Sequence, residues 1–375
     1  MSLGPKMTVS GGICESLPIG PPGSVTDISG TSLSDEFLLM LQKRLLQPDV
    51  SGRRFLPTAM LYNDSGMEIW QRITHLPTYY QTTDEIILLE HHGKDLAGYV
   101  QAGSVILDIG SGYVDATLKS VTVAHSLYRE ARKIMPLLDA LEALQRPVEY
   151  FALDLSQPAL EQAVTELTRR YRFVRPHGLW GTFDDAFRWA QETRQLDVPI
   201  WYVSLGSFFG NDQFDAAVNK LSQWRSLMRR QDRMLLGMDA QDDSAVVWGS
   251  YHDPSGVFVQ FMRNGLMTSN QVLGHQWYRA EDWEVVGVME KGPPLKHKFT
   301  FRARHNVICE PLKINISAGD EIDCYDVYKY GPDILRQQFL AASLTEVASF
   351  KAPHAPFYEY LLMMDDLGKL ENAKQ

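Results

Sequence analysis

The sequence predicts an open α/β sheet with helices on both faces, joined to a second, smaller α+β module. Between residues 104 and 240, strand-like apolar runs alternate with helical stretches, which is typical of a parallel sheet with crossover helices. Each run ends in a glycine turn, a helix or an acidic residue. After residue 240 the runs become polar-alternating and are separated by Pro/Gly turns, which indicates antiparallel strands.

The N-terminal region predicts a leader followed by a helix. Residues 1–30 hold Gly, Pro or Ser at 15 positions and have neither a basic start nor an apolar segment. We therefore expect a flexible leader outside the fold, and not a signal peptide. Apolar residues from Phe37 to Leu45 recur at spacings of three and four, which predicts an amphipathic helix that packs on a partner surface.

The remaining elements follow in order along the chain. In the sheet we expect strands at Ser104–Ile109, Val148–Leu155, Ile200–Leu205 and Arg233–Met238, with helices at Pro158–Tyr171 and Gln213–Arg229. In the second module we expect strands at Val257–Phe261, Glu284–Met289, His297–Arg304 and Val307–Ile316. A last helix, Asp333–Leu344, and a closing strand, Phe357–Met363, complete the prediction.

Composition and charge exclude several classes of function. Lys plus Arg total 36 and Asp plus Glu total 46, so the net charge is −10, the wrong sign for binding nucleic acid or an anionic membrane. The three cysteines have no C-x-x-C spacing, which indicates a reducing, cytoplasmic compartment and no metal site. No apolar run approaches the roughly 20 residues of a membrane-spanning helix.

A glycine turn and an acid at successive strand ends carry the sharpest chemical signal. Gly110, Ser111 and Gly112 follow the strand that contains Asp108, and Asp154 lies at the end of the next strand. Glycines let a ligand approach the backbone, and such a carboxylate accepts both hydroxyls of an adenosine ribose. The pair predicts a nucleoside cofactor. Taken singly, the glycines also fit a tight turn and Asp154 also fits a helix cap.

Six segments resemble the histidine-specific methyltransferase family: LYNDSGMEIWQRITHLPTYYQTTDE (61–85), ILDIGSG (106–112), YFALDLS (150–156), GTFDD (181–185), SLGSFFGN (204–211) and VYKYGPDIL (327–335). Members use S-adenosylmethionine to methylate an amino-acid amine. They include the enzyme that makes histidine betaine for ergothioneine and the fungal 4-dimethylallyltryptophan N-methyltransferase. The resemblance implies a Rossmann-like methyltransferase domain at 83–240 and 332–375, and a substrate-binding domain at 31–82 and 241–331.

The resemblance also implies a role for individual residues. For the cofactor, S-adenosyl-L-methionine, it implies Trp70, Gly110, Ser111, Gly112, Lys133, Asp154, Leu155, Thr182 and Phe183. For the substrate it implies Asn211 and Tyr251 at the amino-acid end, with Tyr325 and Val327 near the side chain. Tyr62, Tyr79 and Asp326 are expected to orient the amine or to take its proton. Trp70 also fits a plain core role, and Asn211 also fits a turn.

The chain departs from the family pattern in two places. Members that methylate histidine carry a glutamate and a serine with one residue between them. At these three positions this chain has Tyr325, Asp326 and Val327, so histidine is a poor candidate substrate. In addition, Tyr113–Ala131 matches no family position, and the glycine turn and the acid lie 42 positions apart, about twice the ~20 expected. This insertion either folds outward, leaving Lys133 at the cofactor, or damages the cofactor loop; translation of an unspliced intron is the competing explanation.

Three functions remain to be compared. The resemblance implies an N-methyltransferase for a small amino-acid-derived substrate, tryptophan-like and from fungal secondary metabolism, acting as a monomer or homodimer. The alternative, motivated by the insertion, is a diverged member that binds a small metabolite without methyl transfer. An NAD-dependent enzyme fits the glycine turn alone and is disfavoured, because residues 113–115 break the G-x-G-x-x-G spacing.

Overall fold

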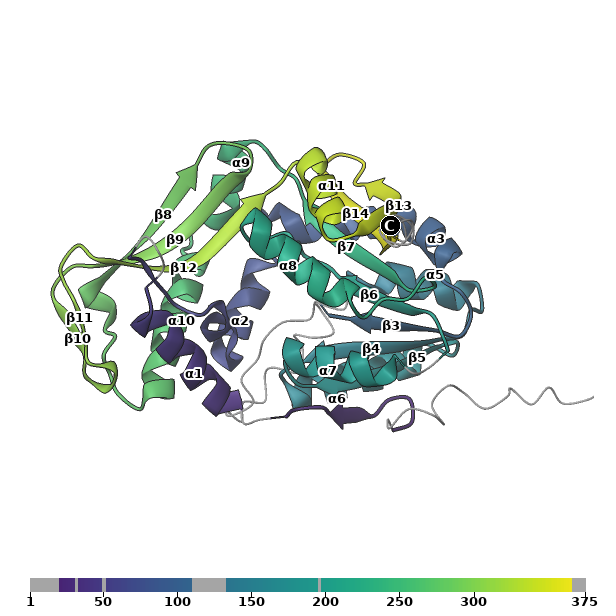
Figure 1. The fold of residues 1–375 in the computed structure, drawn as a ribbon, viewed down its shortest axis with the longest axis horizontal. Helices are drawn as coiled ribbons and strands as arrows, with labels where there is room; N and C mark the ends of the chain where they lie inside the picture. The colour runs from purple at the N-terminus through teal and green to yellow at the C-terminus, as the bar shows by residue number, and fades with distance from the viewer. Residues whose placement is uncertain (1–19, 31–32, 49–51, 110–132, 195–196, 366–375) are drawn as a thin grey trace, which may run out of the picture.

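The computed structural model describes residues 20–30, 33–48, 52–109, 133–194 and 197–365. The chain forms two lobes, of which the larger surrounds an eight-stranded sheet (Figure 1). In spatial order its strands are β1 (Val25–Asp27), β5 (Val174–Trp180), β4 (Val148–Asp154), β3 (Ser104–Asp108), β6 (Ile200–Ser204), β7 (Arg233–Asp239), β14 (Phe357–Met364) and β13 (Leu344–Lys351). Neighbours from β1 to β7 are parallel, whereas β14 is antiparallel to both β7 and β13.

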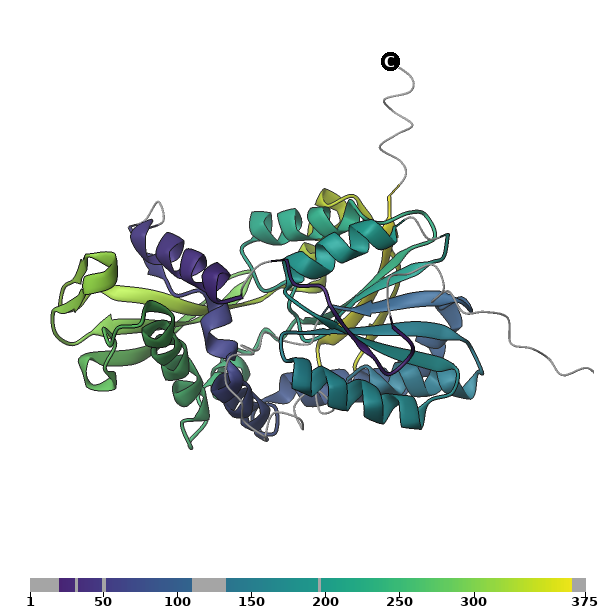
Figure 2. The same ribbon diagram turned by 90° about the horizontal axis from the view of Figure 1, so that it is seen from below.

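Two layers of helices cover the large sheet (Figure 2). One layer holds α3 (Tyr80–Tyr99), α5 (Met135–Ala143) and α6 (Gln157–Arg170), and the other holds α7 (Phe183–Thr193), α8 (Phe214–Arg225) and α11 (Pro332–Ala341). Along β4, Tyr150 and Ala152 join the first core, and Phe151 and Leu153 join the second, because successive side chains of a strand point to opposite faces. The predicted Rossmann-like α/β fold is confirmed.

The smaller lobe has its own sheet and core. Its sheet has the order β2 (Arg54–Phe55), β12 (Glu321–Lys329), β9 (Leu295–Ala303) and β8 (Trp283–Glu290), and a hairpin joins β10 (Val307–Cys309) to β11 (Ile314–Ile316). The helices of this lobe are α1 (Leu33–Leu46), α2 (Asp64–Ile73), α9 (Ser244–Tyr251) and α10 (Val257–Leu273), with the 3-10 turn η2 (Thr58–Tyr62). The core therefore combines two chain segments, 37–79 and 247–327.

The expected strand at Val257–Phe261 is wrong, because this segment begins helix α10. The Asp253 carboxylate accepts the backbone N–H groups of Val257 and Phe258, both at 3.0 Å, and so satisfies donors that a helix leaves unpaired. The apolar side chains that continue at helical spacing, such as Phe261, are buried against the small sheet and η2. Tertiary burial and the cap thus outweigh the β-propensity of Val and Phe.

The expected leader over residues 1–30 is wrong for the part that the structure describes. Val25–Asp27 forms β1 and extends the large sheet alongside β5. Gly178 on β5 makes this possible, since a Cβ there would lie 2.9 Å from the Val25 side chain. Strands β2, β5, β12 and β13 were not predicted either, and the single strand expected at Val307–Ile316 is wrong, because this segment folds into the hairpin of β10 and β11. The insertion at 113–131 lies outside the described residues.

The part of the chain that the structure describes contains no helix with both the length and the apolar character required to cross a membrane.

Candidate active site

Two buried carboxylates mark the carboxyl edge of β3 and β4. Asp108 ends β3 and accepts a hydrogen bond from the Tyr150 hydroxyl at 2.9 Å. Asp154 ends the neighbouring strand, is 1% exposed, and accepts the backbone N–H of Ser156 at 2.6 Å. A carboxylate offers about four acceptor positions, and the hydrogen bond from Ser156 occupies one of those on Asp154. Ligands of open α/β sheets bind at this edge. The predicted Gly110, Ser111 and Gly112 lie outside the described residues.

Thr182 and Phe183 follow the carboxyl end of β5, at the start of α7. Thr182 caps α7 through a reciprocal arrangement in which its hydroxyl donates to Asp185 Oδ2 at 2.7 Å and accepts the Asp185 N–H at 3.1 Å. The Phe183 ring stacks on Phe208 at a centroid distance of 4.7 Å. The hydroxyl of Thr182 is therefore committed to the helix cap, whereas Phe183 supplies a half-buried aromatic ring at the sheet edge.

The predicted tyrosines gather in one aromatic cluster, which we define as Tyr62, Trp70, Tyr79, Tyr251 and Tyr325 together with Phe258 and Phe261. The Trp70 ring lies 5.7 Å from Tyr62 and 5.6 Å from Tyr79. Tyr251 lies 6.2 Å from Tyr79 and 6.3 Å from Tyr325. The residues of the cluster come from six segments: η2, α2, the start of α3, the end of α9, α10 and β12. Tertiary packing alone brings these six segments together.

The aromatic cluster touches the carboxyl edge of the large sheet. Leu155, the residue after Asp154, packs against Met67 on α2, and Tyr62 and Trp70 pack against this pair. The structure thus brings the predicted ribose acid and the predicted amine-orienting tyrosines to the same junction between the lobes.

Three tyrosines of the cluster, Tyr62, Tyr251 and Tyr325, have raised pKa values. Burial, reinforced by the neighbouring Tyr325, raises the pKa of both Tyr62 and Tyr251 well above its usual value. Tyr62 and Tyr325 also hydrogen bond to each other. These hydroxyls can orient an amine through hydrogen bonds, but at neutral pH they are not phenolate bases.

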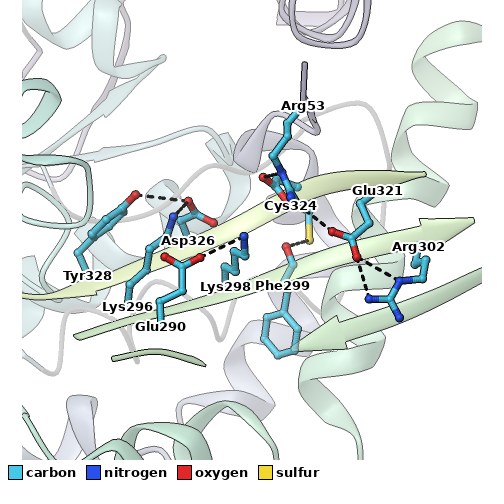
Figure 3. Close-up of polar contacts among 11 residues, drawn as sticks. Arg53, Glu290, Lys296, Lys298, Phe299, Arg302, Glu321, Cys324, Asp326 and Tyr328 are labelled. Carbon is cyan, nitrogen blue, oxygen red and sulfur yellow. Dashed lines mark hydrogen bonds and ion pairs between the residues drawn. The ribbon is translucent and has the colours of Figure 1, made fainter. Parts of the chain in front are cut away.

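Asp326 does not join the tyrosines. Its carboxylate pairs with Lys296 Nζ at 2.8 Å and lies near the Tyr328 hydroxyl, as Figure 3 shows. Burial raises the pKa of Asp326, and the hydrogen bond from Lys296 partly offsets this. Strand alternation along β12 puts Tyr325 and Val327 toward the aromatic cluster and Asp326 on the opposite face.

Asn211 contacts the smaller lobe through the backbone of β12. Its side-chain oxygen accepts the N–H of Tyr328 at 2.9 Å, so Asn211 is more than a turn residue. The next residue, Lys329, reaches the Tyr251 hydroxyl at 3.2 Å. Asn211 and Tyr251 are therefore connected through consecutive residues of β12.

Lys133 belongs to a separate buried group behind the loop after β6. Its Nζ pairs with Glu85 Oε2 at 2.9 Å, and Glu85 Oε1 accepts the N–H of Gly206 at 2.6 Å. Glu359, which is fully buried, contacts Glu85. Lys133 thus anchors the first turn after β6, the loop that carries Asn211.

Several polar residues of the site were not predicted. Gln81 and Lys329 both donate to the Tyr251 hydroxyl, and Lys329 pairs with Asp239 at the end of β7. Asp84 lies one turn after Gln81 on α3. Burial together with the charge of Asp239 raises the pKa of Asp84 to about 6. Of these residues, only Asp239 could have been found from the sequence, because it is an acidic residue at the end of an apolar, strand-like run.

Comparison with known proteins agrees with this geometry. The pattern of the family described as "Histidine-specific methyltransferase, SAM-dependent" matches residues 41–364. Ergothioneine biosynthesis protein 1 of Neurospora crassa is 31% identical over 301 residues, which is 80% of this chain and 32% of that protein. N-methyltransferase dtpB of Aspergillus flavus is 28% identical over 64% of this chain and 66% of its own length. The 4-dimethylallyltryptophan N-methyltransferase easF of Claviceps fusiformis is 31% identical over 59% of this chain and 58% of its own.

This chain spans about a third of the Neurospora protein and less than two thirds of the other two. The family pattern, in contrast, covers both lobes and the strand edge between them. The chain therefore belongs to the histidine-specific, S-adenosylmethionine-dependent methyltransferase family.

Proposed function

We propose that this chain transfers a methyl group from S-adenosylmethionine to the amine of a small amino-acid-derived substrate with an aromatic, tryptophan-like side chain. One observation carries the proposal: Leu155 packs against Met67, and so joins the Asp154 end of β4 to the aromatic cluster. The similarity to an N-methyltransferase of Aspergillus and to a 4-dimethylallyltryptophan N-methyltransferase of Claviceps supports an amine acceptor and an aromatic substrate.

The residues at the strand edge fit the cofactor. Asp154 would hold the ribose hydroxyls, with Leu155 and the ring of Phe183 beside the nucleoside, and Lys133 would support the neighbouring loop. Trp70 is half-buried and presents an aromatic ring at the junction of the lobes, and aromatic faces attract cations such as a sulfonium. When bound, S-adenosylmethionine supplies an electrophilic methyl group.

The remaining residues would position the acceptor. Methyl transfer to nitrogen requires an unprotonated amine held close to and in line with the methyl carbon, and the hydroxyls of Tyr62 and Tyr79 would orient that amine. Asn211 and Tyr251 would hold the amino-acid end. Tyr325 and Val327 would pack against the apolar ring of the substrate side chain. These two replace the polar pair of the histidine-methylating members.

Asp326 is not part of this proposal, because its ion pair with Lys296 lies on the face of β12 away from the cluster. We also propose the domain division 31–82 with 241–331 and 83–240 with 332–375, supported by the separate cores of the two lobes. A cytoplasmic monomer or homodimer that binds no nucleic acid is consistent with the buried free thiols of Cys309 and Cys324 and with the net charge of −10.

The test combines binding and turnover. Calorimetry should show S-adenosylmethionine binding in the micromolar range, about −8 kcal/mol, and Asp154→Asn should weaken it because one charged acceptor is lost. Mass spectrometry with a panel of aromatic amino acids should then detect N-methylated product. Asn211→Ala and Tyr251→Phe should abolish most turnover, and Tyr99→Phe, an exposed tyrosine on α3, should not. Cofactor binding without methylation of any panel member would favour the diverged, non-transferring alternative.

A further inference from the structure

Tyr251 receives two hydrogen bonds from groups that donate. Its hydroxyl oxygen lies 3.1 Å from Gln81 Nε2 and 3.2 Å from Lys329 Nζ. A lysine ammonium has donors and no acceptor. Lys329 is 5% exposed and its charge is held by the buried carboxylate of Asp239, which also accepts the Tyr80 hydroxyl at 2.8 Å. The Lys329 contact therefore uses an acceptor position of the Tyr251 oxygen.

The orientation of the Gln81 amide is fixed by its second partner. The Ser250 hydroxyl donates its proton to the carbonyl of Val247 at 2.9 Å. The Gln81 atom 3.2 Å from Ser250 Oγ must therefore be a donor, which makes it the NH2 group and not the amide oxygen. The same NH2 group faces the Tyr251 hydroxyl, so Gln81 also donates to Tyr251.

The Tyr251 hydroxyl therefore donates its proton to neither Gln81 nor Lys329. Both flanking groups occupy lone pairs of the phenolic oxygen, and neither can accept the hydroxyl proton. The ring is held by stacking on His297 at a centroid distance of 4.8 Å and an interplanar angle of 17°. The hydroxyl proton is consequently directed away from Gln81 and Lys329, and the ammonium of Lys329 adds positive charge behind it.

We propose that Lys329 and Gln81 are positioning residues that make Tyr251 an obligatory hydrogen-bond donor, so that the site selects substrates with a free, anionic carboxylate over their esters. The proposal deepens the proposed function and rests on it for the identity of the ligand. A carboxylate accepts a charge-assisted hydrogen bond from the hydroxyl and is attracted by Lys329, whereas a methyl ester carries no charge.

The test uses L-tryptophan and L-tryptophan methyl ester as probes with the full chain. Calorimetry in the presence of saturating S-adenosylhomocysteine measures binding without turnover. Wild type should bind the acid at least tenfold more tightly than the ester, as expected for a hydrogen bond to a charged group. Gln81→Leu should reduce this ratio severalfold, and removal of the Lys329 ammonium should bring it near one.

The variants are chosen to separate positioning from folding. Lys329→Met alone leaves Asp239 buried without its cation and is expected to destabilise the protein, so Lys329→Met is combined with Asp239→Asn, which removes both charges. Lys351→Met is the matched control, since Lys351 is an exposed lysine whose Nζ lies 5.8 Å from the Tyr358 ring. A merely structural role would weaken the acid, the ester and S-adenosylmethionine together, whereas a positioning role changes the acid-to-ester ratio alone.

The outcomes are distinct. An unchanged acid-to-ester ratio in the folded Lys329→Met/Asp239→Asn variant overturns the proposal, as does a wild type that binds neither probe or binds both equally. If the ratio behaves as expected but mass spectrometry finds no methylated product, the positioning role stands and the methyltransferase function fails.

Discussion

Replacement of Glu359 by glutamine should change how stability depends on pH. Glu359 lies on β14 opposite Gly237 of β7, and a Cβ on Gly237 would lie 2.8 Å from Glu359 Oε1 and 2.1 Å from Glu85 Oε1. The two carboxyl groups thus converge over one glycine in a site without solvent. Burial and the neighbouring Glu85 raise the pKa of Glu359 well above its usual value, and Lys133 offsets this only in part.

The magnitude follows from proton linkage. Because the folded-state pKa of Glu359 is raised above the unfolded value near 4.5, the folded state holds a proton that the unfolded state releases, and stability falls as pH rises above 4.5. The loss is at most about 1.4 kcal/mol per pH unit, so up to about 2.7 kcal/mol between pH 5.5 and 7.5. Glutamine has the size of glutamate and keeps a hydrogen-bond donor toward Glu85. The stability of Glu359→Gln should therefore not fall in this way as the pH rises.

The assay is urea unfolding of wild type and Glu359→Gln at pH 5.5 and 7.5. Groups outside the Glu85–Glu359 pair titrate alike in both proteins, so the difference between their free energies of unfolding isolates this pair. Between pH 5.5 and 7.5 that difference should move in favour of the variant, by up to about 2.7 kcal/mol. Glu346→Gln on β13 is the control, since a hydrogen bond from Arg336 helps to lower the pKa of Glu346 despite its partial burial and its contribution is complete at both pH values. Parallel pH dependence of wild type and Glu359→Gln would refute the protonated buried pair.

Three further substitutions test local packing and hydrogen bonding. Gly237→Ala should destabilise the protein by about 2 kcal/mol, because the new Cβ meets a Glu85 oxygen that Lys133 and a backbone N–H hold in place; thermal unfolding should show a lowered Tm. Gly98→Ala on the exposed side of α3, where a Cβ meets nothing within 4 Å, should instead stabilise it by about 0.5 to 1 kcal/mol. Arg53→Ala removes the forked hydrogen bonds to buried Asp323 and should cost about 1 to 3 kcal/mol; an unchanged urea midpoint would contradict this.

Local pattern was sufficient for the central strands of the large sheet. The strands at Ser104, Val148, Ile200 and Arg233 are buried on both faces, so their apolar runs are nearly continuous and easy to recognise. Strand β5 was missed because Pro176, His177 and Gly178 interrupt its run.

The smaller lobe was harder to predict. Val257–Phe261 has strand-like composition, and only the carboxylate of Asp253 and the surrounding core make it a helix. Similarly, Asp326 was expected to act on the amine together with Tyr62 and Tyr79, but it faces away from the aromatic cluster, because neighbours on a strand point to opposite sides. Lys296 on β9, which holds Asp326, comes from a different strand and is adjacent only through sheet register.

The sequence by itself determined the doubly wound sheet, the acid at the end of β4 and the set of aromatic residues, because apolar periodicity, turn chemistry and residue type are local properties of the chain. Tertiary structure alone decided which of those residues meet. Lys329 and Tyr251 are 78 positions apart, and Gln81 and Tyr251 are 170 apart. Contacts over such separations depend on tertiary packing, within the smaller lobe for Lys329 and between the two lobes for Gln81.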